Sequence, residues 1–324
     1  VASFVMGVAT VASPVIGPLA AATAGRDRMG WVSGLLLGAS IAGMIGSRAG
    51  AALISGWLSW RGAYALTAVC ALACAWLVHT RVPATPRGNP VSFPSYLRAP
   101  LAELRRRPPL RRSAVLQMCT FAGFTATWTS IGPVLTNDLR LSAGAVGWVA
   151  LVALAAMVTV PWTGQLVDRL GPDRVSTWSL GATLAAALLM TGQLFGGLPG
   201  LVALVAGVLL LDVAMQSGMV ANVTRFYRIE TSTRSTMNTA YMTCAFVAGS
   251  VGSWSGAWLY ELCGWIGITA LVAVLATAGL LVSRPSRRRW TAGPDARRAQ
   301  LPGSGSASTS PIAGSEVKVK PSSR

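Results

Sequence analysis

The chain has 324 residues, of which 52% are hydrophobic and only 11% are charged. Soluble domains carry charged side chains at about a quarter of their positions, so this composition excludes an ordinary soluble domain and indicates a membrane protein. The 27 basic residues outnumber the 10 acidic ones, and the resulting net charge of +17 fits either nucleic-acid binding or an orienting role at a membrane.

Apolar segments long enough to cross a bilayer, about twenty residues each, recur along the chain and are separated by Gly, Pro and charged clusters. We predict nine such spans, so the expected fold is an all-α integral membrane protein. The spans are 1–22, 31–58, 62–80, 113–135, 145–165, 176–194, 198–223, 236–260 and 264–283. A tail from 284 to 324 follows, rich in Ser, Gly, Pro and basic residues, a composition typical of disorder.

The basic residues lie almost entirely on one side of the predicted membrane. If the spans alternate in direction, 24 of the 27 share the side of the 81–112 loop and the C-terminal tail. Arg61 and Arg140 lie opposite, and Arg48 lies within a span. By the positive-inside rule the basic side is cytoplasmic, which predicts a multi-pass protein of the cell inner membrane with a cytoplasmic C-terminus. We expect the positive charge to contact anionic lipid headgroups and not nucleic acid.

A weak repeat relates the two ends of the chain. A shift of 206 residues aligns the second and third spans with the eighth and ninth, for example Gly46 with Gly252, although two glycine-rich helices could also match by chance. Parallel repeats of this kind mark one large architecture among secondary transporters. The four-residue spacing of Gly252 and Gly256 also predicts close helix packing.

The repeat predicts a chain that lacks its beginning. Three spans precede the 81–112 loop and six follow it, so we expect a twelve-helix protein whose first three helices are absent from this sequence. The expected domains are the remnant of an N-terminal bundle at 1–80, a cytoplasmic central loop at 81–112, a C-terminal six-helix bundle at 113–283 and the disordered tail at 284–324.

The most specific motif is GQLVDRLGPDR at 164–174. It resembles the loop signature of the major facilitator superfamily, G-x-L-x-D-R-x-G-x-x-[RK], and it follows the second span of a six-span half, as in that family. The resemblance implies two six-helix bundles and a cytoplasmic gating loop made by Gly164, Asp168, Arg169, Gly171 and Arg174. Gly164 allows neighbouring helices to approach, Gly171 suits a tight turn, and Asp168 can join helix ends through charge-assisted hydrogen bonds with the two arginines. The alternative is a turn that only fixes topology.

Other segments resemble the bacterial drug-efflux-like branch of this family. SWRGAYAL, after the second span, is similar to the family's Gly-Trp-Arg turn, and TRFYRIETSTRSTMNTAYM is similar to the loop before its eleventh helix. In the second span, Gly34 and Gly43 match an efflux signature whose proline bends the helix, but Arg48 stands at the proline position. The resemblance therefore favours efflux, although the usual bend is not encoded.

The resemblance implies that the fourth and seventh spans line a central cavity. In the fourth span, Gln117, Phe121, Phe124 and Trp128 are spaced to share one helical face. An aromatic face with one amide suits flat, lipophilic or cationic substrates. Aromatic residues at this spacing also occur as ordinary packing, which is the alternative.

The seventh span carries three polar candidates for the same cavity. Asp212 lies in mid-helix, Gln216 lies one turn further on the same face, and Asn222 lies nearer the cytoplasm. A carboxylate inside a membrane is a candidate for substrate or proton binding, and a structural ion pair is the alternative. Because an arginine within the membrane is also costly, we expect Arg48 to need a partner. Asp212 is one candidate, and the absent helices or backbone carbonyls are the others.

Together these features predict a monomeric secondary transporter that works by alternating access and exports small lipophilic or cationic molecules in exchange for protons. An importer or facilitator on the same fold, or a nonfunctional truncated remnant, are the alternatives. The HExxH, GxSxG and GxxxxGK[ST] motifs are missing, and the five cysteines lack metal-ligand spacing. We therefore expect no enzymatic activity, no metal and no cofactor, with a proton gradient as the energy source.

Overall fold

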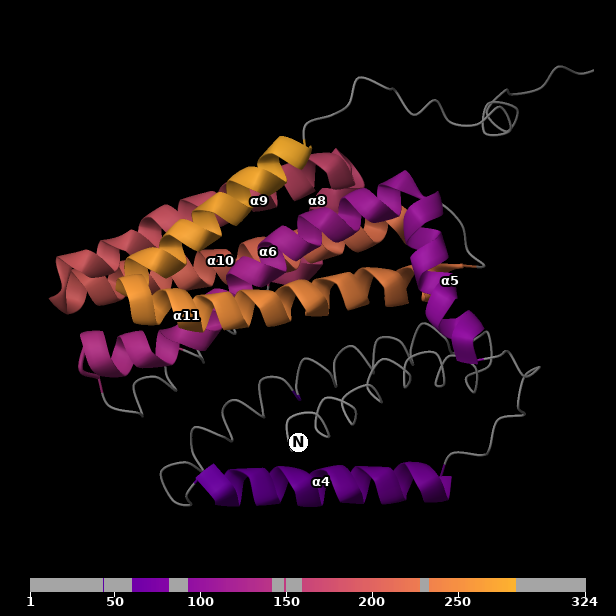
Figure 1. Cartoon of the computed structure of the whole chain (residues 1–324), viewed down its shortest axis with the longest axis horizontal. Coiled ribbons are helices and arrows are strands. Elements are labelled where there is room, and N and C mark those ends of the chain that lie inside the picture. The colour runs from indigo at the N-terminus through magenta and orange to yellow at the C-terminus, as the bar shows by residue number, and fades with distance from the viewer. Residues whose placement is uncertain are drawn as a thin grey trace, which may run out of the picture. The chain divides into compact units, whose positions relative to one another are not determined.

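The computed structural model describes residues 60–81, 93–141, 159–227 and 233–283, together with the single positions 43 and 149. Helices are the only regular structure in these residues. They are α4 (Trp60–Arg81), α5 (Phe93–Arg106), α6 (Pro108–Pro133), the π-helix η2 (Val134–Asp138), α8 (Val160–Leu170), α9 (Pro172–Met190), the 3₁₀-helix η4 (Thr191–Phe195), α10 (Gly197–Tyr227) and α11 (Arg234–Ser283) (Figure 1). The predicted spans 1–22 and 31–58, most of 145–165 and the tail 284–324 lie outside the described residues.

Several of these helices are suited to a membrane. Three stretches are long and apolar enough to cross one, namely Pro172–Phe195, Gly197–Tyr227 and Arg234–Ser283. A shorter apolar helical stretch, Tyr64–Thr80, lies in α4. The predicted all-α membrane fold is therefore confirmed, and the spans expected at 176–194 and 198–223 match α9 with η4 and α10.

The helix α11 consists of two arms that meet at Gly264. This residue has φ 64° and ψ −153°, a conformation that glycine adopts at little cost and other residues rarely adopt. The chain turns back there and brings the two arms close together. A Cβ added at Gly267 in the second arm would lie 2.9 Å from the carbonyl oxygen of Leu259 in the first arm. Figure 1 shows the orange first arm and the yellow second arm joined at one end. The two arms match the spans predicted at 236–260 and 264–283.

The first arm of α11 packs closely on α6 because small residues face each other. A Cβ at Gly256 would lie 2.7 Å from the Cα of Ala126, and a Cβ at Gly252 would overlap the backbone of Ala122. Contacts of this kind between small residues let two helix backbones approach within a membrane. The predicted role of Gly252 and Gly256 in close helix packing is confirmed.

Three hydrophobic clusters fill the described helix bundle. A small one joins α8, α9 and α10 around Val167, Val175 and Ala221, and the other two, a larger and a smaller one, lie toward opposite ends. The larger cluster joins α6, η2, α9, α10 and α11, and within it the indole N–H of Trp265 donates a hydrogen bond of 3.0 Å to the carbonyl oxygen of Met190. The smaller cluster packs Leu110 of α6 against Phe226 of α10 and Tyr241 of α11. The clusters hold α6, α10 and α11 together along most of their length.

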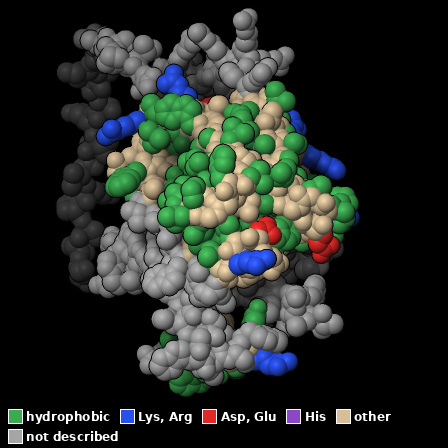
Figure 2. Space-filling view, turned by 90° about the vertical axis from the view of Figure 1, so that its left-hand side faces the viewer, with side chains coloured by type: hydrophobic (Ala, Val, Ile, Leu, Met, Phe, Trp, Pro, Cys, Tyr) green, Lys and Arg blue, Asp and Glu red, His purple; other side chains and the backbone are tan. Residues whose placement is uncertain are grey.

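A helix, α5, occupies part of the predicted central loop 81–112. Its Leu104 packs against the smaller cluster, so we call this end of the bundle the α5 end and the opposite end, with η2 and η4, the η end. Hydropathy does not indicate α5, because its fourteen residues are too few for a span and include several charges. Figure 2 shows hydrophobic side chains spread over the described surface of the η end, with other, basic and acidic groups among them.

The close contact between α11 and α6 gives a first prediction. Gly252→Ala should lower the free energy of unfolding by about 1–3 kcal/mol, because the new methyl group meets the Ala122 backbone, which cannot rotate away. Gly181→Ala in α9 is the matched control, since its Cβ would meet no described atom within 4 Å. Unfolding of both variants can be followed in detergent by thermal denaturation. Equal stability of the two variants would contradict the packing described for Gly252.

Candidate functional site

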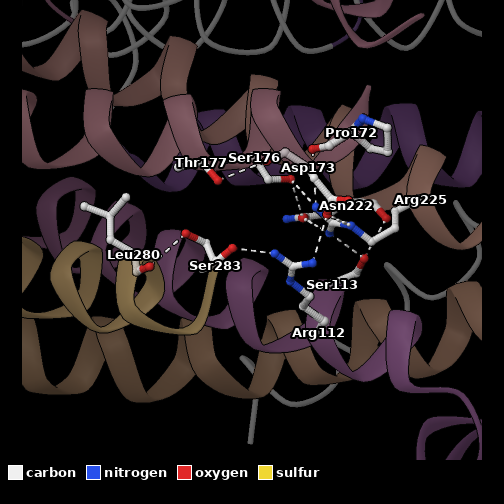
Figure 3. Close-up of polar contacts among 10 residues, drawn as sticks. All are labelled: Arg112, Ser113, Pro172, Asp173, Ser176, Thr177, Asn222, Arg225, Leu280 and Ser283. Carbon is white, nitrogen blue, oxygen red and sulfur yellow. Dashed lines mark hydrogen bonds and ion pairs between the residues drawn. The ribbon is translucent and has the colours of Figure 1, made fainter. Parts of the chain in front are cut away.

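The most extensive polar arrangement in the described residues surrounds the guanidinium of Arg225, near the end of α10 (Figure 3). Its Nη1 donates to Ser113 Oγ of α6 at 2.9 Å and to Asn222 Oδ1 at 2.8 Å. Its Nη2 donates to Ser176 Oγ of α9 at 2.8 Å and to the Pro172 carbonyl at 3.3 Å. These bonds join three helices through one side chain that is only 8% exposed.

The same network reaches the surface at Asp173, in the first turn of α9. Asp173 Oδ1 accepts hydrogen bonds from Arg225 Nε at 3.1 Å and from Arg112 Nη1 at 3.0 Å. Arg112 also donates to the carbonyl oxygen of Ser283, the last residue of α11, at 2.5 Å. Through Asp173 and Arg112 the network therefore extends to a fourth helix. We call this set of residues the polar network.

Asp173 lies inside the GQLVDRLGPDR motif, at a position to which the sequence analysis assigned no role. The residues expected to form the gating loop, Asp168, Arg169 and Arg174, have exposed side chains. Gly171 ends α8 and precedes α9 with φ 84°, so the tight turn expected there is confirmed. Gly164 has no described atom within 4 Å of an added Cβ. The motif thus shapes the turn, and Asp173 makes the described ion pairs with α6 and α10.

Two of the predicted cavity residues belong to the polar network. Asn222 Nδ2 donates to Gln117 Oε1 at 3.3 Å, and the hydroxyl of Tyr241 donates to the same oxygen at 2.7 Å. Gln117 and Asn222 are each 1% exposed and Tyr241 is fully buried. The amides therefore lie between helices, with hydrogen-bond partners on α6, α10 and α11.

The other cavity candidates lie nearer the middle of the bundle. Phe121, Phe124 and Trp128 form a partly buried row along α6. The ring centroids of Phe121 and Phe124 are 5.9 Å apart, and those of Phe124 and Trp128 are 6.3 Å apart. We call this row the aromatic strip. At its far end the indole N–H of Trp128 donates a 3.0 Å hydrogen bond to Asp212 Oδ1 of α10. Gln216 follows one helical turn after Asp212 and is partly buried.

Asp212 is only 6% exposed, so the structure joins a buried carboxylate to an aromatic row on the facing helix. Desolvation makes such a carboxylate depend on its hydrogen-bond donors. Chemically, the pair offers a hydrogen-bond acceptor with negative charge beside aromatic faces, an environment that suits cations. The proposed partner Arg48 lies outside the described residues.

A cavity of about 530 Å³ lies elsewhere, at the η end. Its lining includes Arg140, Gln193 and Leu201, and it contains none of the predicted site residues. The residues of the candidate site therefore do not line this cavity.

Sequence reasoning missed the central role of Arg225. It assigned this arginine to a cytoplasmic loop, but α10 continues to Tyr227 and buries the side chain. The sequence did contain a signal. Arg225 follows the predicted span by only two residues, and an arginine at that position needs hydrogen-bond partners if the helix extends past it. Ser113 and Ser176 carried no comparable signal, since single serines are frequent in membrane helices.

The polar network gives a second prediction. Arg225→Lys should lower the free energy of unfolding by about 1–3 kcal/mol, because one ammonium group cannot replace the planar fork that serves five acceptors. Arg112→Lys is the control, because its side chain is 27% exposed and serves two acceptors. Its cost should stay below about 1 kcal/mol. Thermal unfolding in detergent compares the two, and a larger loss for Arg112→Lys would refute the central role of Arg225.

The part of the chain that contains the polar network and the aromatic strip is similar to known proteins. A family model described as Major Facilitator Superfamily matches residues 113–321, more than half of the chain. "Uncharacterized transporter YgaY" of Escherichia coli O157:H7 is 27% identical over 277 residues, which cover 85% of this chain and 69% of that protein. "Probable transporter SCO4007" of Streptomyces coelicolor is 32% identical over 295 residues, which cover 87% of this chain and 66% of that protein.

The chain therefore spans about two thirds of the length of these relatives. The family match begins at Ser113, the first network residue of α6 after Arg112, and extends through α11. The motif at 164–174, the all-helical fold and these relatives agree, and the chain belongs to the Major Facilitator Superfamily of transporters.

Proposed function

We propose that the chain works as a secondary active transporter by alternating access, exporting small lipophilic or cationic molecules in exchange for protons. The observation that carries this proposal is the hydrogen bond between Trp128 and Asp212, which places a buried carboxylate at the end of the aromatic strip. Membership of a transporter family supports the transport part of the proposal.

The exchange follows from the chemistry of one carboxylate. Asp212 can neutralise its charge with a proton or with the cationic group of a substrate, but one site does not hold both. A cation arriving along Phe121 and Phe124 would gain favourable contact with their ring faces and then displace the proton from Asp212. A proton arriving from the other side of the membrane would release the cation. A lipophilic substrate without charge would use the aromatic faces alone.

The polar network supports the moving part of the mechanism. Alternating access in this architecture moves whole bundles, so each bundle has to keep its internal contacts. Arg225 joins α6, α9 and α10 by five hydrogen bonds at the α5 end. We infer that these helices move as one unit while the environment of Asp212 changes.

We also propose that the α5 end faces the cytoplasm of the cell, in the inner membrane, with the C-terminus on the same side. Exposed arginines gather at this end, among them Arg98, Arg105 and Arg174, whereas Arg140 lies at the η end. This distribution is the one that the positive-inside rule requires. The protein is expected to act as a monomer on small-molecule substrates, with the proton gradient as its energy source.

A transport assay tests the role of Asp212. In inverted membrane vesicles that contain the chain, uptake of a fluorescent lipophilic cation such as ethidium should collapse on addition of a protonophore. Asp212→Asn should reduce this proton-dependent uptake at least about tenfold, because the amide neither binds a proton nor carries charge. Trp128→Phe is the matched variant, since it keeps an aromatic ring and removes only the hydrogen bond, and its effect should be smaller.

Each other outcome of this assay has a defined meaning. Uptake by the wild-type chain that ignores the protonophore would overturn proton coupling and favour a facilitator. Full activity of Asp212→Asn would exclude this carboxylate from the exchange. Absence of transport by the wild-type chain would contradict the proposal that this chain transports on its own.

A charge swap tests the proposed partnership of Arg48 with Asp212. If the two side chains form a pair, Asp212→Arg and Arg48→Asp should each abolish transport or stable expression, because either change then brings two like charges together within the membrane. In that case the double variant should recover a measurable part of what each single variant loses. Lack of any recovery would end the pairing hypothesis.

A further inference from the structure

One side of α5 is fixed to the bundle. Leu104 packs against the smaller hydrophobic cluster, which includes Leu110 and Tyr241. On the same side Arg107 Nε donates to Glu103 Oε2 at 2.5 Å, and these side chains are only 22% and 15% exposed. The acidic residue of α5 is therefore already paired and lies against the protein.

The other side of α5 is exposed and basic. Arg98 and Arg105 are both exposed and lie seven residues apart, two helical turns, so they share one face. Leu101 lies between them and is 49% exposed. Arg106 is exposed at the edge of this face. Among the side chains of α5 that the structure describes, we call Arg98, Leu101, Arg105 and Arg106 the free face, with three guanidinium groups around the large apolar side chain of Leu101.

The contacts of α5 fix its level relative to the membrane helices. Leu104 packs on the cluster that contains Phe226, near the end of α10, and Met237, in the first turn of α11. Next to this cluster the guanidinium carbon of Arg234 lies 5.7 Å from the ring centroid of Tyr227. Tyrosine is typical of the membrane–water interface, and long basic side chains reach headgroups from there. We therefore infer that a helix anchored at this point lies at the depth of the lipid headgroups.

We propose that the free face of α5 is a binding surface for anionic phospholipids, with the phosphate of a phosphatidylglycerol headgroup held by Arg98, Arg105 and Arg106. A guanidinium can donate two parallel hydrogen bonds to a phosphate. A zwitterionic headgroup also has a phosphate, but its own cation repels the arginines, whereas an anionic headgroup has no such cation. Leu101 enters the boundary of the acyl chains, as apolar side chains of interfacial helices do. The match of charge and depth identifies membrane lipid as the occupant. This proposal does not depend on transport or its direction.

Hydrogen–deuterium exchange in nanodiscs tests the proposal on the full chain. The amides of residues 93–106 should exchange at least about tenfold more slowly in phosphatidylglycerol nanodiscs than in phosphatidylcholine nanodiscs. The triple variant Arg98→Gln, Arg105→Gln, Arg106→Gln should lose this difference. The triple variant Lys318→Gln, Lys320→Gln, Arg324→Gln is the matched control, because it removes the same charge from the end of the tail and should keep the difference.

Further arms separate the occupants. Glycerol phosphate added to phosphatidylcholine nanodiscs should leave exchange unchanged, and protection by this soluble phosphate would overturn the assignment to membrane lipid. Equal protection of 93–106 in both lipids would show that protein or neutral lipid covers the face, which would also overturn it. The comparison between lipids uses the wild-type chain and therefore stands even if the glutamine variant folds poorly. Replacement of the three arginines by lysine should keep most of the protection, because the charge remains.

Discussion

The buried guanidinium of Arg225 is the constraint on which the arrangement of the described helices depends. An arginine removed from water is tolerable only when its donors are satisfied, and here the acceptors come from α6, α9 and α10 itself. A shift of any of these helices by one residue would leave buried donors without partners, at a cost of about 1–3 kcal/mol each. The side chain therefore fixes the register of three helices at once.

Away from this network, close packing of small residues and a few separate hydrogen bonds hold the bundle. The first arm of α11 lies on α6 through glycine and alanine. Two hydrogen bonds cross the same contact, from Thr125 Oγ1 to the carbonyl oxygen of Gly249 at 2.8 Å and between the hydroxyls of Thr129 and Ser253 at 2.7 Å. The aromatic strip lies at the same level of α6 as this contact, since a Cβ at Gly249 would meet the Phe121 ring. Asp212, at the end of the strip, lies about ten residues and roughly 15 Å along α10 from Asn222. The polar network and the carboxylate of Asp212 therefore lie at different levels of the bundle. This separation suits a site whose surroundings change during a cycle.

The sequence predicted the helices better than it predicted their contacts. Hydropathy located α9, α10 and both arms of α11 to within a few residues, because lipid imposes long apolar runs. It missed α5, which is short and charged, and it ended α10 too early because Arg225 resembled a loop residue. Both errors have one origin: hydropathy indicates segments that face lipid along their length, whereas Leu104 of α5 and Arg225 of α10 contact other helices.

The candidate site shows the same limit. Intramembrane polarity singled out Asp212, Gln117 and Asn222, and helical spacing placed the aromatic residues of α6 on one face. Neither signal could show that Gln117 and Asn222 share one network while Trp128 and Asp212 form a separate pair, since both pairings join residues more than eighty positions apart. Asp173 was passed over because the family signature contains Asp168 and leaves position 173 unspecified. In the structure it is Asp173, in the first turn of α9, whose carboxylate accepts hydrogen bonds from two arginines.

The unequal exposure of the polar network also determines how the surrounding solution acts on it. The Asp173 side chain is 63% exposed and that of Arg112 is 27% exposed, but that of Arg225 is only 8% exposed. Dissolved ions screen exposed charges over about 8–10 Å at physiological ionic strength and affect buried pairs far less. Rising salt therefore weakens the link from α9 through Arg112 to the last residue of α11, while the inner bonds of Arg225 persist. The ion pair between Arg112 and Asp173 is thus the part of this end that follows the ionic strength of the surrounding medium, while apolar packing keeps the second arm of α11 in place.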